Sequence, residues 1–232
     1  YAYDVNGNRI SRKTVGVATQ SATYDTGDRL LAQGGVVHQF NADGYLAQRG
    51  GDTFHYSVRG ELLSANVGGK SVTYTYDGMG RRVSRNDTDG LTQYLYAGLG
   101  DLLPSAVRGA DGVLTHYYYD DLDLLFALQR GADRFYVVTD QVGTPVAVVD
   151  AGGALVKSMT YDSFGLPLAD TDPGFRLAIG FGGGLADPIT GWTRLGVRDY
   201  DPVAGRWTAL DPALFDGHRE IFTRIAIGRA NL

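Results

Sequence analysis

Apolar and polar residues alternate along much of the chain in short stretches, a pattern typical of β-strands. The segment 70–76 reads Lys-Ser-Val-Thr-Tyr-Thr-Tyr and alternates with a period of two, as a strand with one buried face does. The runs 146–149 and 155–161 are rich in β-branched and apolar residues and flank the turn-forming residues 150–153, which predicts a hairpin. We therefore expect an all-β protein with very little helix.

One unit recurs along this pattern: an aromatic residue, usually an Asp or Asn, a glycine about four residues after the aromatic, and then an aliphatic residue. The aromatic residues of the six clearest units are Tyr3, Tyr24, Phe40, Tyr56, Tyr76 and Tyr161. The aromatic ends a strand, Asp and Gly form a turn, and the aliphatic residue begins the next strand. Because one hairpin cannot bury its apolar face alone, the units are expected to stack into one continuous sheet.

An ordinary β-sandwich with glycine-rich turns is the alternative to a repeat array. Its turns do not normally repeat one aromatic–Asp–Gly–aliphatic unit at steps of about 20 residues, so the repeats favour the array. Composition agrees with a folded, strand-rich chain, because 44% of the residues are hydrophobic and Gly and Tyr number 33 and 15. The net charge of −5 argues against nucleic acid as the main partner. The chain has no cysteine, which excludes disulfides and thiolate chemistry.

Two longer motifs carry a resemblance to a known family. Residues 136–145 read Tyr-Val-Val-Thr-Asp-Gln-Val-Gly-Thr-Pro, and residues 198–212 read Arg-Asp-Tyr-Asp-Pro-Val-Ala-Gly-Arg-Trp-Thr-Ala-Leu-Asp-Pro. The first resembles a signature of rearrangement-hotspot (Rhs) proteins, toxin-complex C subunits and teneurins, and the second resembles the Rhs-associated core motif. Together with residues 179–188, these motifs make the C-terminal third most similar to the teneurin YD shell.

This resemblance to the YD-repeat family implies a fold and a domain organisation. Residues 1–135 are expected to be YD repeats, and residues 136–232 an Rhs repeat-associated core that is truncated at its C-terminus. In this family the β-hairpins wind into a spiral that forms a hollow shell or barrel, and the core turns inward as a plug. The first residues are neither an initiator Met nor a signal peptide, so we expect further YD repeats before Tyr1. A strand edge left open there would favour aggregation of the isolated piece.

The resemblance also supplies candidate site residues. Self-cleaving members of the family need the leading arginine and a later aspartate of the core motif, which here are Arg198 and Asp211. Carboxylates that share a proton can activate water and polarise a carbonyl, and Asp199 and Asp201 are spare candidates for this role. A second aspartate and the cut site would lie beyond Leu232. The alternative is that Arg198 and Asp211 form only a buried salt bridge. Thirteen residues apart across a turn centred on Gly205, the two side chains are expected to meet on adjoining strands.

No cofactor or metal site is expected from the remaining motifs. The glycine-rich run 180–184 has no following helix to complete a phosphate loop. Asp120, Asp121 and Asp123 lack the later Gly and Glu of an EF-hand, and a solvated turn is the better interpretation. The histidines His38, His55, His116 and His218 lack metal-ligand spacing. Residues Asn86, Asp87 and Thr88 match an N-glycosylation acceptor, which inside a shell would be only a turn.

The predicted function is that of a structural shell in a secreted, polymorphic toxin-like protein. Such a shell would enclose a C-terminal effector domain of the same polypeptide and release it by aspartyl-type self-cleavage in the full-length protein. The alternative is a teneurin-like adhesion or recognition scaffold without cargo or cleavage. Either reading places the protein outside the cell or on its surface, and the sequence has no apolar run long enough for a membrane helix.

Overall fold

A long antiparallel sheet makes up most of the computed structural model, which describes residues 1–14 and 16–210. Eighteen strands follow one another along the chain, and each pairs with the next in sequence. The strands are β1 (Ala2–Tyr3), β2 (Arg9–Arg12), β3 (Gln20–Tyr24), β4 (Leu30–Gln33), β5 (Val36–Phe40), β6 (Leu46–Arg49), β7 (Asp52–Tyr56), β8 (Leu62–Val67), β9 (Lys70–Tyr76), β10 (Arg82–Asp87), β11 (Gly90–Leu95), β12 (Ala106–Arg108), β13 (Leu114–Tyr119), β14 (Leu125–Arg130), β15 (Asp133–Thr139), β16 (Pro145–Asp150), β17 (Leu155–Tyr161) and β18 (Pro167–Asp170). The predicted hairpin of 146–161 is β16 with β17.

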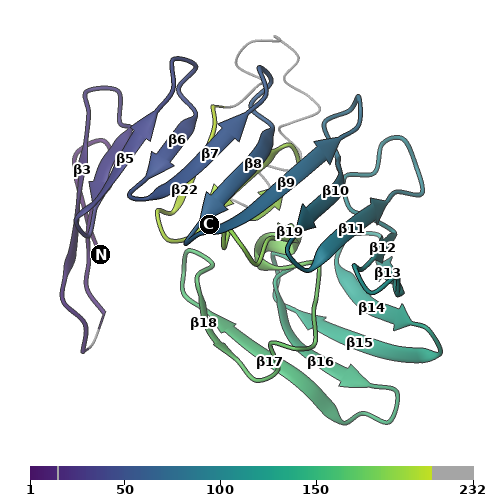
Figure 1. The fold of residues 1–232 in the computed structure, drawn as a ribbon. Coiled ribbons are helices and arrows are strands. Elements are labelled where there is room, and N and C mark those ends of the chain that lie inside the picture. The colour runs from purple at the N-terminus through teal and green to yellow at the C-terminus, as the bar shows by residue number, and fades with distance from the viewer. Residues whose placement is uncertain (15, 211–232) are drawn as a thin grey trace.

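A second, four-stranded sheet follows the first and lies inside its curve (Figure 1). It contains β19 (Leu185–Ala186), β20 (Thr193–Leu195), β21 (Arg198–Asp201) and β22 (Arg206–Trp207), preceded by a 3-10 turn, η1 (Phe181–Gly183). We call residues 179–210 the core segment. In the described part of the chain η1 is the only helical element, so the all-β prediction is confirmed.

The repeated unit forms one kind of turn. The side-chain oxygen of its first polar residue accepts hydrogen bonds from the backbone N–H groups two and four residues later, and the fourth residue of the turn has a positive φ. Nine turns share this pattern, and they begin at Asp4, Asp25, Asn41, Ser57, Asp77, Asp120, Asp140, Asp150 and Asp162. The hydrogen bonds satisfy donors that the strand ladder leaves open, which explains why the unit recurs.

Two of these turns use aspartate where the others use glycine. Asp28 and Asp123 are the non-glycine residues with positive φ in the described chain, at 62° and 60°, and both occupy the fourth turn position. In the Tyr24 unit the glycine, Gly27, lies one position earlier, and the left-handed residue is Asp28. Asp120 and Asp123 are therefore the first and fourth residues of a repeat turn, in agreement with the turn interpretation of that acidic cluster.

Tyrosines of the repeat also tie each unit to the one before it. The hydroxyls of Tyr24, Tyr76 and Tyr96 donate to the backbone carbonyls of Arg9, Leu62 and Arg82, at 2.8–2.9 Å. Each accepting carbonyl belongs to the residue that begins a strand after the preceding turn. The aromatic residue of the unit thus acts between units as well as within one.

The sheet curls until the turn between β17 and β18 reaches its first strands. Arg12 forms an ion pair with Asp162 at 3.0 Å, and the rings of Tyr1 and Phe164 meet edge to face at 5.1 Å. The guanidinium of Arg9 lies 4.2 Å from the centre of the Phe164 ring. These side-chain contacts join the two ends of the sheet. Among the described residues, backbone pairing joins only strands that are consecutive in the chain.

The predicted boundary at residue 135, between the YD repeats and the Rhs-associated core, is based on sequence motifs, and nothing in the fold tests it. Strand β15 runs across that position, and the large sheet continues to β18 before the small sheet begins at Leu185. The expected association through an open strand edge stays a prediction as well.

Candidate functional site

Arginines on the inner face of the large sheet meet aspartates of the core segment. A bulge between Arg82 and Ser84 of β10 lets Arg82 and Arg85 both point inward although they are three residues apart, on the face that also carries Tyr74 of β9. Both arginine side chains are almost fully buried, as are Asp187 and Asp199 of the core segment. Burying a charge is costly unless it is paired, so each of these groups needs its partner.

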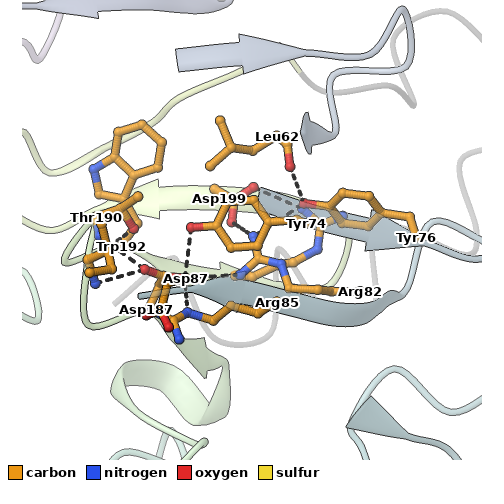
Figure 2. Close-up of polar contacts among 12 residues, drawn as sticks. Leu62, Tyr74, Tyr76, Arg82, Arg85, Asp87, Asp187, Thr190, Trp192 and Asp199 are labelled. Carbon is orange, nitrogen blue, oxygen red and sulfur yellow. Dashed lines mark hydrogen bonds and ion pairs between the residues drawn. The ribbon is translucent and has the colours of Figure 1, made fainter. Parts of the chain in front are cut away.

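Asp199 lies between two guanidinium groups, and Figure 2 shows it beside that of Arg82. Its Oδ1 accepts from Nη2 of Arg82 at 2.8 Å, and its Oδ2 accepts from Nη1 of Arg194 at 2.9 Å. The exposed fractions of the three side chains are 3%, 1% and 1%. Arg194 also donates to the backbone carbonyl of Gly80, at the end of a repeat turn. One carboxylate therefore fastens the core segment to β10, while its partner Arg194 binds the neighbouring turn.

Asp187 forms the second connection (Figure 2). Its Oδ2 accepts from Nε of Arg85 at 3.1 Å and from the hydroxyl of Tyr74 at 2.8 Å, and its Oδ1 accepts from the backbone N–H of Thr190 at 3.0 Å. Burial acts to raise the pKa of Asp187, but the nearby charges of Arg82 and Arg85 outweigh it and hold the pKa below its usual value. Burial, together with the adjacent Asp187 charge, raises the pKa of Tyr74, so this phenol stays a donor.

Asp201 forms the third connection, to β6. Its Oδ2 accepts from Nη1 of Arg49 at 2.8 Å, and its Oδ1 accepts from the backbone N–H groups of Val203 and Ala204. We refer to the three aspartates and their arginine partners as the ion-pair latch. Its members are Asp187, Asp199, Asp201, Arg49, Arg82, Arg85 and Arg194.

Tyrosine rings complete the surroundings of the latch arginines. The guanidinium of Arg82 lies 4.0 Å from the centre of the Tyr74 ring, and that of Arg194 lies 4.5 Å from the Tyr76 ring. Cation–π contacts of this kind stabilise a desolvated guanidinium. Arg82 reaches both Asp199, at 2.8 Å, and Asp187, at 3.9 Å. The latch residues therefore neutralise one another's charges and hold the core segment in position against the large sheet.

The candidate site residues predicted from the sequence lie in different surroundings in the structure. The spare carboxylates Asp199 and Asp201 are latch residues, each held by arginine. Arg198 begins β21 and places its guanidinium 4.0 Å from the centre of the Trp207 ring. The expected reversal around Gly205 is present, because Tyr200 pairs with Trp207 and Gly205 has a φ of 69°. Asp211 lies outside the described residues, so its meeting with Arg198 remains a prediction.

The glycine-rich run 180–184 packs closely against the small sheet. A Cβ at Gly184 would lie 2.6 Å from the carbonyl oxygen of Arg194, and one at Gly180 would lie 2.9 Å from Cβ of Ala186. These glycines permit a close backbone approach. In the described residues no group of three or more His, Asp or Glu side chains is arranged to hold a metal ion. His218 lies outside the described part of the chain.

Sequence reasoning missed the arginine side of the latch. Arg49, Arg85 and Arg194 lie outside the motifs above, Arg82 lies in the Tyr76 repeat unit without a role of its own, and surface positions are the usual expectation for arginine. In the structure Arg82 and Arg85 pair across the ladder with Tyr76 and Tyr74, but a period-two pattern does not reveal the bulge that turns both arginines inward. A charged residue at an inward strand position predicts a buried partner, but the sequence does not say which one.

A hollow of about 1030 Å³ remains beside the core segment. Its lining includes the aromatic residues Tyr119, Phe164, Phe181, Tyr200 and Trp207, together with turn residues of the C-terminal half of the large sheet. Phe181 stacks on Tyr200, and Tyr200 meets Trp207 edge to face. On the other side, Gly60 and Gly80 approach Ala209 and Val197 of the core segment closely, so those turns are packed against it.

No helix among residues 1–14 and 16–210 has the length and apolar character needed to cross a membrane.

Comparison with known sequences places the chain near the teneurins. A family model described as the teneurin YD-shell matches residues 1–226. Teneurin-4 of Mus musculus and Teneurin-4 of Homo sapiens are each 39% identical over 224 residues, which is 93% of this chain. Teneurin-m of Drosophila melanogaster is 37% identical over 218 residues, or 89% of this chain. The chain spans only 8% of the length of each of these relatives.

Solved structures show the same fold at low sequence identity. The chain resembles a chain of the crystal structure of TcdB2-TccC3, with a TM-score of 0.62, 17% identity, and coverage of 85% of this chain and 12% of that chain. A chain of the Photorhabdus luminescens Tc holotoxin pore that carries a TccC3 mutation gives a TM-score of 0.62 and 17% identity, over 86% of this chain and 12% of that one. These likenesses concern the shell fold alone.

Proposed function

The chain belongs to the teneurin YD-shell family, and we propose that it serves as a rigid shell scaffold within a longer extracellular adhesion or recognition protein. It supplies part of the shell wall together with the core segment that the wall encloses. In this role the outer surface makes the contacts of the protein, and the interior keeps the wall in one shape.

The ion-pair latch is the observation that carries this proposal. Three aspartates of one short core segment each bind an arginine of β6 or β10, at 2.8–3.1 Å and largely out of solvent. An enzyme that hydrolyses peptides with carboxylates needs two of them close together with access to water. Arginine partners and burial at these three residues favour a fixed, mechanical joint.

Enclosure of a C-terminal effector, with release by self-cleavage, is the second candidate function. The hollow of about 1030 Å³ beside the core segment favours it only as one part of a larger interior, because this volume holds a short peptide segment and not a folded domain. The motif that contains Arg198 and Asp211 supplies the residues for cleavage by family resemblance. Arg198 at the start of β21 would hold and orient the Asp211 carboxylate, and that carboxylate would act on water or on the scissile carbonyl.

A denaturing gel of the purified full-length protein separates the two functions. The scaffold proposal predicts one uncut polypeptide, in wild type and in Asp211→Asn alike. Cells that display the full-length protein should then gain binding to cells or ligands that control cells lack. A C-terminal fragment that appears in wild type and disappears in Asp211→Asn, with an unchanged melting temperature, would replace the scaffold proposal with the second candidate.

A further inference from the structure

The outer face of strands β5–β11 carries many polar side chains and almost no charge, beside a few exposed apolar residues such as Leu91 and Leu95. Residues that pair directly across neighbouring strands form three rows on this face, which is opposite the buried residues Phe54, Val72 and Tyr74. The rows contain Gln39, Gln48, Thr53, Asn66 and Ser71; His55, Ser64, Thr73 and Asn86; and Thr75, Ser84 and Gln93. Amides and hydroxyls of this kind exchange hydrogen bonds with water or with sugar hydroxyls at little cost.

One residue of this outer face is part of an acceptor motif for N-linked glycans. Asn86, Asp87 and Thr88 read Asn-x-Thr, the single complete Asn-x-Ser/Thr sequence of the chain. Asn86 and Thr88 are both exposed, at the end of β10 and in the short turn to β11. In the described part of the chain neither side chain has a hydrogen-bond partner, so a sugar on Asn86 would displace no contact.

The middle residue of the motif turns away from the other two. The Asp87 carboxylate, 3% exposed, pairs with Arg85 at 2.5 Å and accepts from the backbone N–H of Asp89 at 2.9 Å. A free carboxylate beside the acceptor amide would repel an anionic donor. Here Arg85 balances that charge beneath the sheet, while the amide of Asn86 and the hydroxyl of Thr88 remain outside.

We propose that Asn86 is a site of N-linked glycosylation. The donor class is a polyprenyl diphosphate-linked oligosaccharide, presented by a membrane transferase of the secretory route. The Nδ2 atom of Asn86 forms a bond to C1 of the first sugar as the bond from C1 to the phosphate oxygen breaks. The polyprenyl diphosphate leaves with the bonding electrons, and the amide proton passes to a base of the transferase, so no oxidant or reductant is needed.

The surroundings of Asn86 suit the attached sugar. Its registered neighbours are Thr73 on β9 and Leu91 on β11, and the Leu91 side chain is 48% exposed. The first sugar can cover the apolar surface of Leu91, and the next sugars can lie over the uncharged rows. Glycosylation thereby turns an exposed apolar position into a hydrated one, which protects this face of the shell.

The test is to produce the full-length protein through the secretory pathway of a cultured animal cell, together with a known secreted glycoprotein. Tryptic peptide 86–108 is then analysed by mass spectrometry before and after enzymatic removal of N-glycans. We expect glycan mass on this peptide in wild type and conversion of Asn86 to Asp on enzymatic release. The glycan should be lost in Asn86→Gln and Thr88→Ala and kept in Thr88→Ser.

A matched control comes from the same outer face. Asn66→Gln changes an amide of the outer rows that lies outside any acceptor motif, and it should leave the glycan on peptide 86–108 unchanged. A bare wild-type peptide beside a fully glycosylated co-secreted protein would overturn the proposal, as would a glycan that persists in Thr88→Ala. The inference requires the extracellular placement of the proposed function, but its readout is a peptide mass. Failure of adhesion or of cleavage would therefore not alter it.

Discussion

Two halves of one sheet hold the same core segment by different chemistry. Strands β6–β10 present Arg49, Arg82 and Arg85 to its aspartates, in addition to apolar contacts around Trp192. Strands β11–β17 present a nearly continuous apolar surface to Ile179 and Leu185. The apolar half includes Tyr94, Val107, Tyr117, Leu125, Leu128, Val137, Val148 and Met159. We call these the ionic half and the apolar half.

The outer faces of the two halves differ as well. The uncharged polar rows cover the ionic half and the adjoining strands β5 and β11, whereas β13–β15 expose Tyr118, Tyr136 and Val138, at 41%, 44% and 51%. Tyr118 and Tyr136 flank Ala127 in register, so these side chains form one exposed apolar area. The repeat turn is the same in both halves. The turn thus fixes the backbone, and the residues between turns are free to define different inner and outer surfaces.

The largest expected effect is the loss of one latch carboxylate. Asp199→Asn leaves Arg82 and Arg194 without their shared charge in a buried site and should lower the free energy of unfolding by about 3–5 kcal/mol. Chemical denaturation of the wild-type and variant proteins measures this loss of unfolding free energy. The control is Asp89→Asn, which removes the exposed pair with Arg176 and should change stability little. Equal effects of the two substitutions would show that the buried ion pairs of Asp199 stabilise the fold no more than an exposed pair does.

The apolar half should respond to a cavity instead. Leu128 is fully buried in β14 between Tyr117 and Phe135, its registered neighbours. Leu128→Ala should lower the free energy of unfolding by about 3 kcal/mol, because apolar burial is lost and a cavity remains. The exposed apolar side chain of Leu155 offers the control, since Leu155→Ala should have a much smaller effect. A cost at Leu128 that matches Leu155 would show that this half is loosely packed.

A smaller effect is expected from the tyrosine hydroxyls between units. Tyr76 in the ionic half donates to Leu62 and also accepts from Arg82 at 3.3 Å, whereas Tyr119 in the apolar half donates to Pro104. Tyr76→Phe and Tyr119→Phe should each cost about 1 kcal/mol, with the larger loss at Tyr76. Phe40 already occupies a repeat aromatic position, so the ring itself is compatible with either site. Thermal or chemical unfolding of the two variants would show whether the order is reversed.

The smallest expected effect is a dependence on pH at His38, in strand β5 beside the ionic half. Burial lowers the pKa of His38 below its ordinary 6.5, and the nearby charges are those of Asp201 and Arg49. Below pH 6.5 the unfolded chain then binds more protons at this residue than the folded chain does. Stability should therefore fall as the pH drops from 6.5 towards the folded pKa. His38→Gln should flatten this part of the stability profile, and an unchanged profile would exclude His38 as its cause.

The fold was largely predictable from local patterns. Period-two alternation located strands such as β9, and the turn residues Asp77 and Gly80 marked where strands reverse. These signals are local, because a turn is specified by its own hydrogen bonds and backbone angles. Asp28 is an exception to the glycine pattern for a local reason as well. Aspartate tolerates a positive φ, so this turn position does not carry the glycine that marks the others.

The sequence by itself therefore determined the all-β class, the repeat turn and membership of a shell-forming family. Only the tertiary structure decided that Asp199 and Asp201, which share a motif with Arg198, bind arginines more than a hundred residues earlier in the chain. It also decided that Asn86 faces outward while Asp87 turns inward. Such pairings arise from the curl of the whole sheet around the core segment. Charge in a sequence shows that a partner is needed, and only the folded chain brings one within 3 Å.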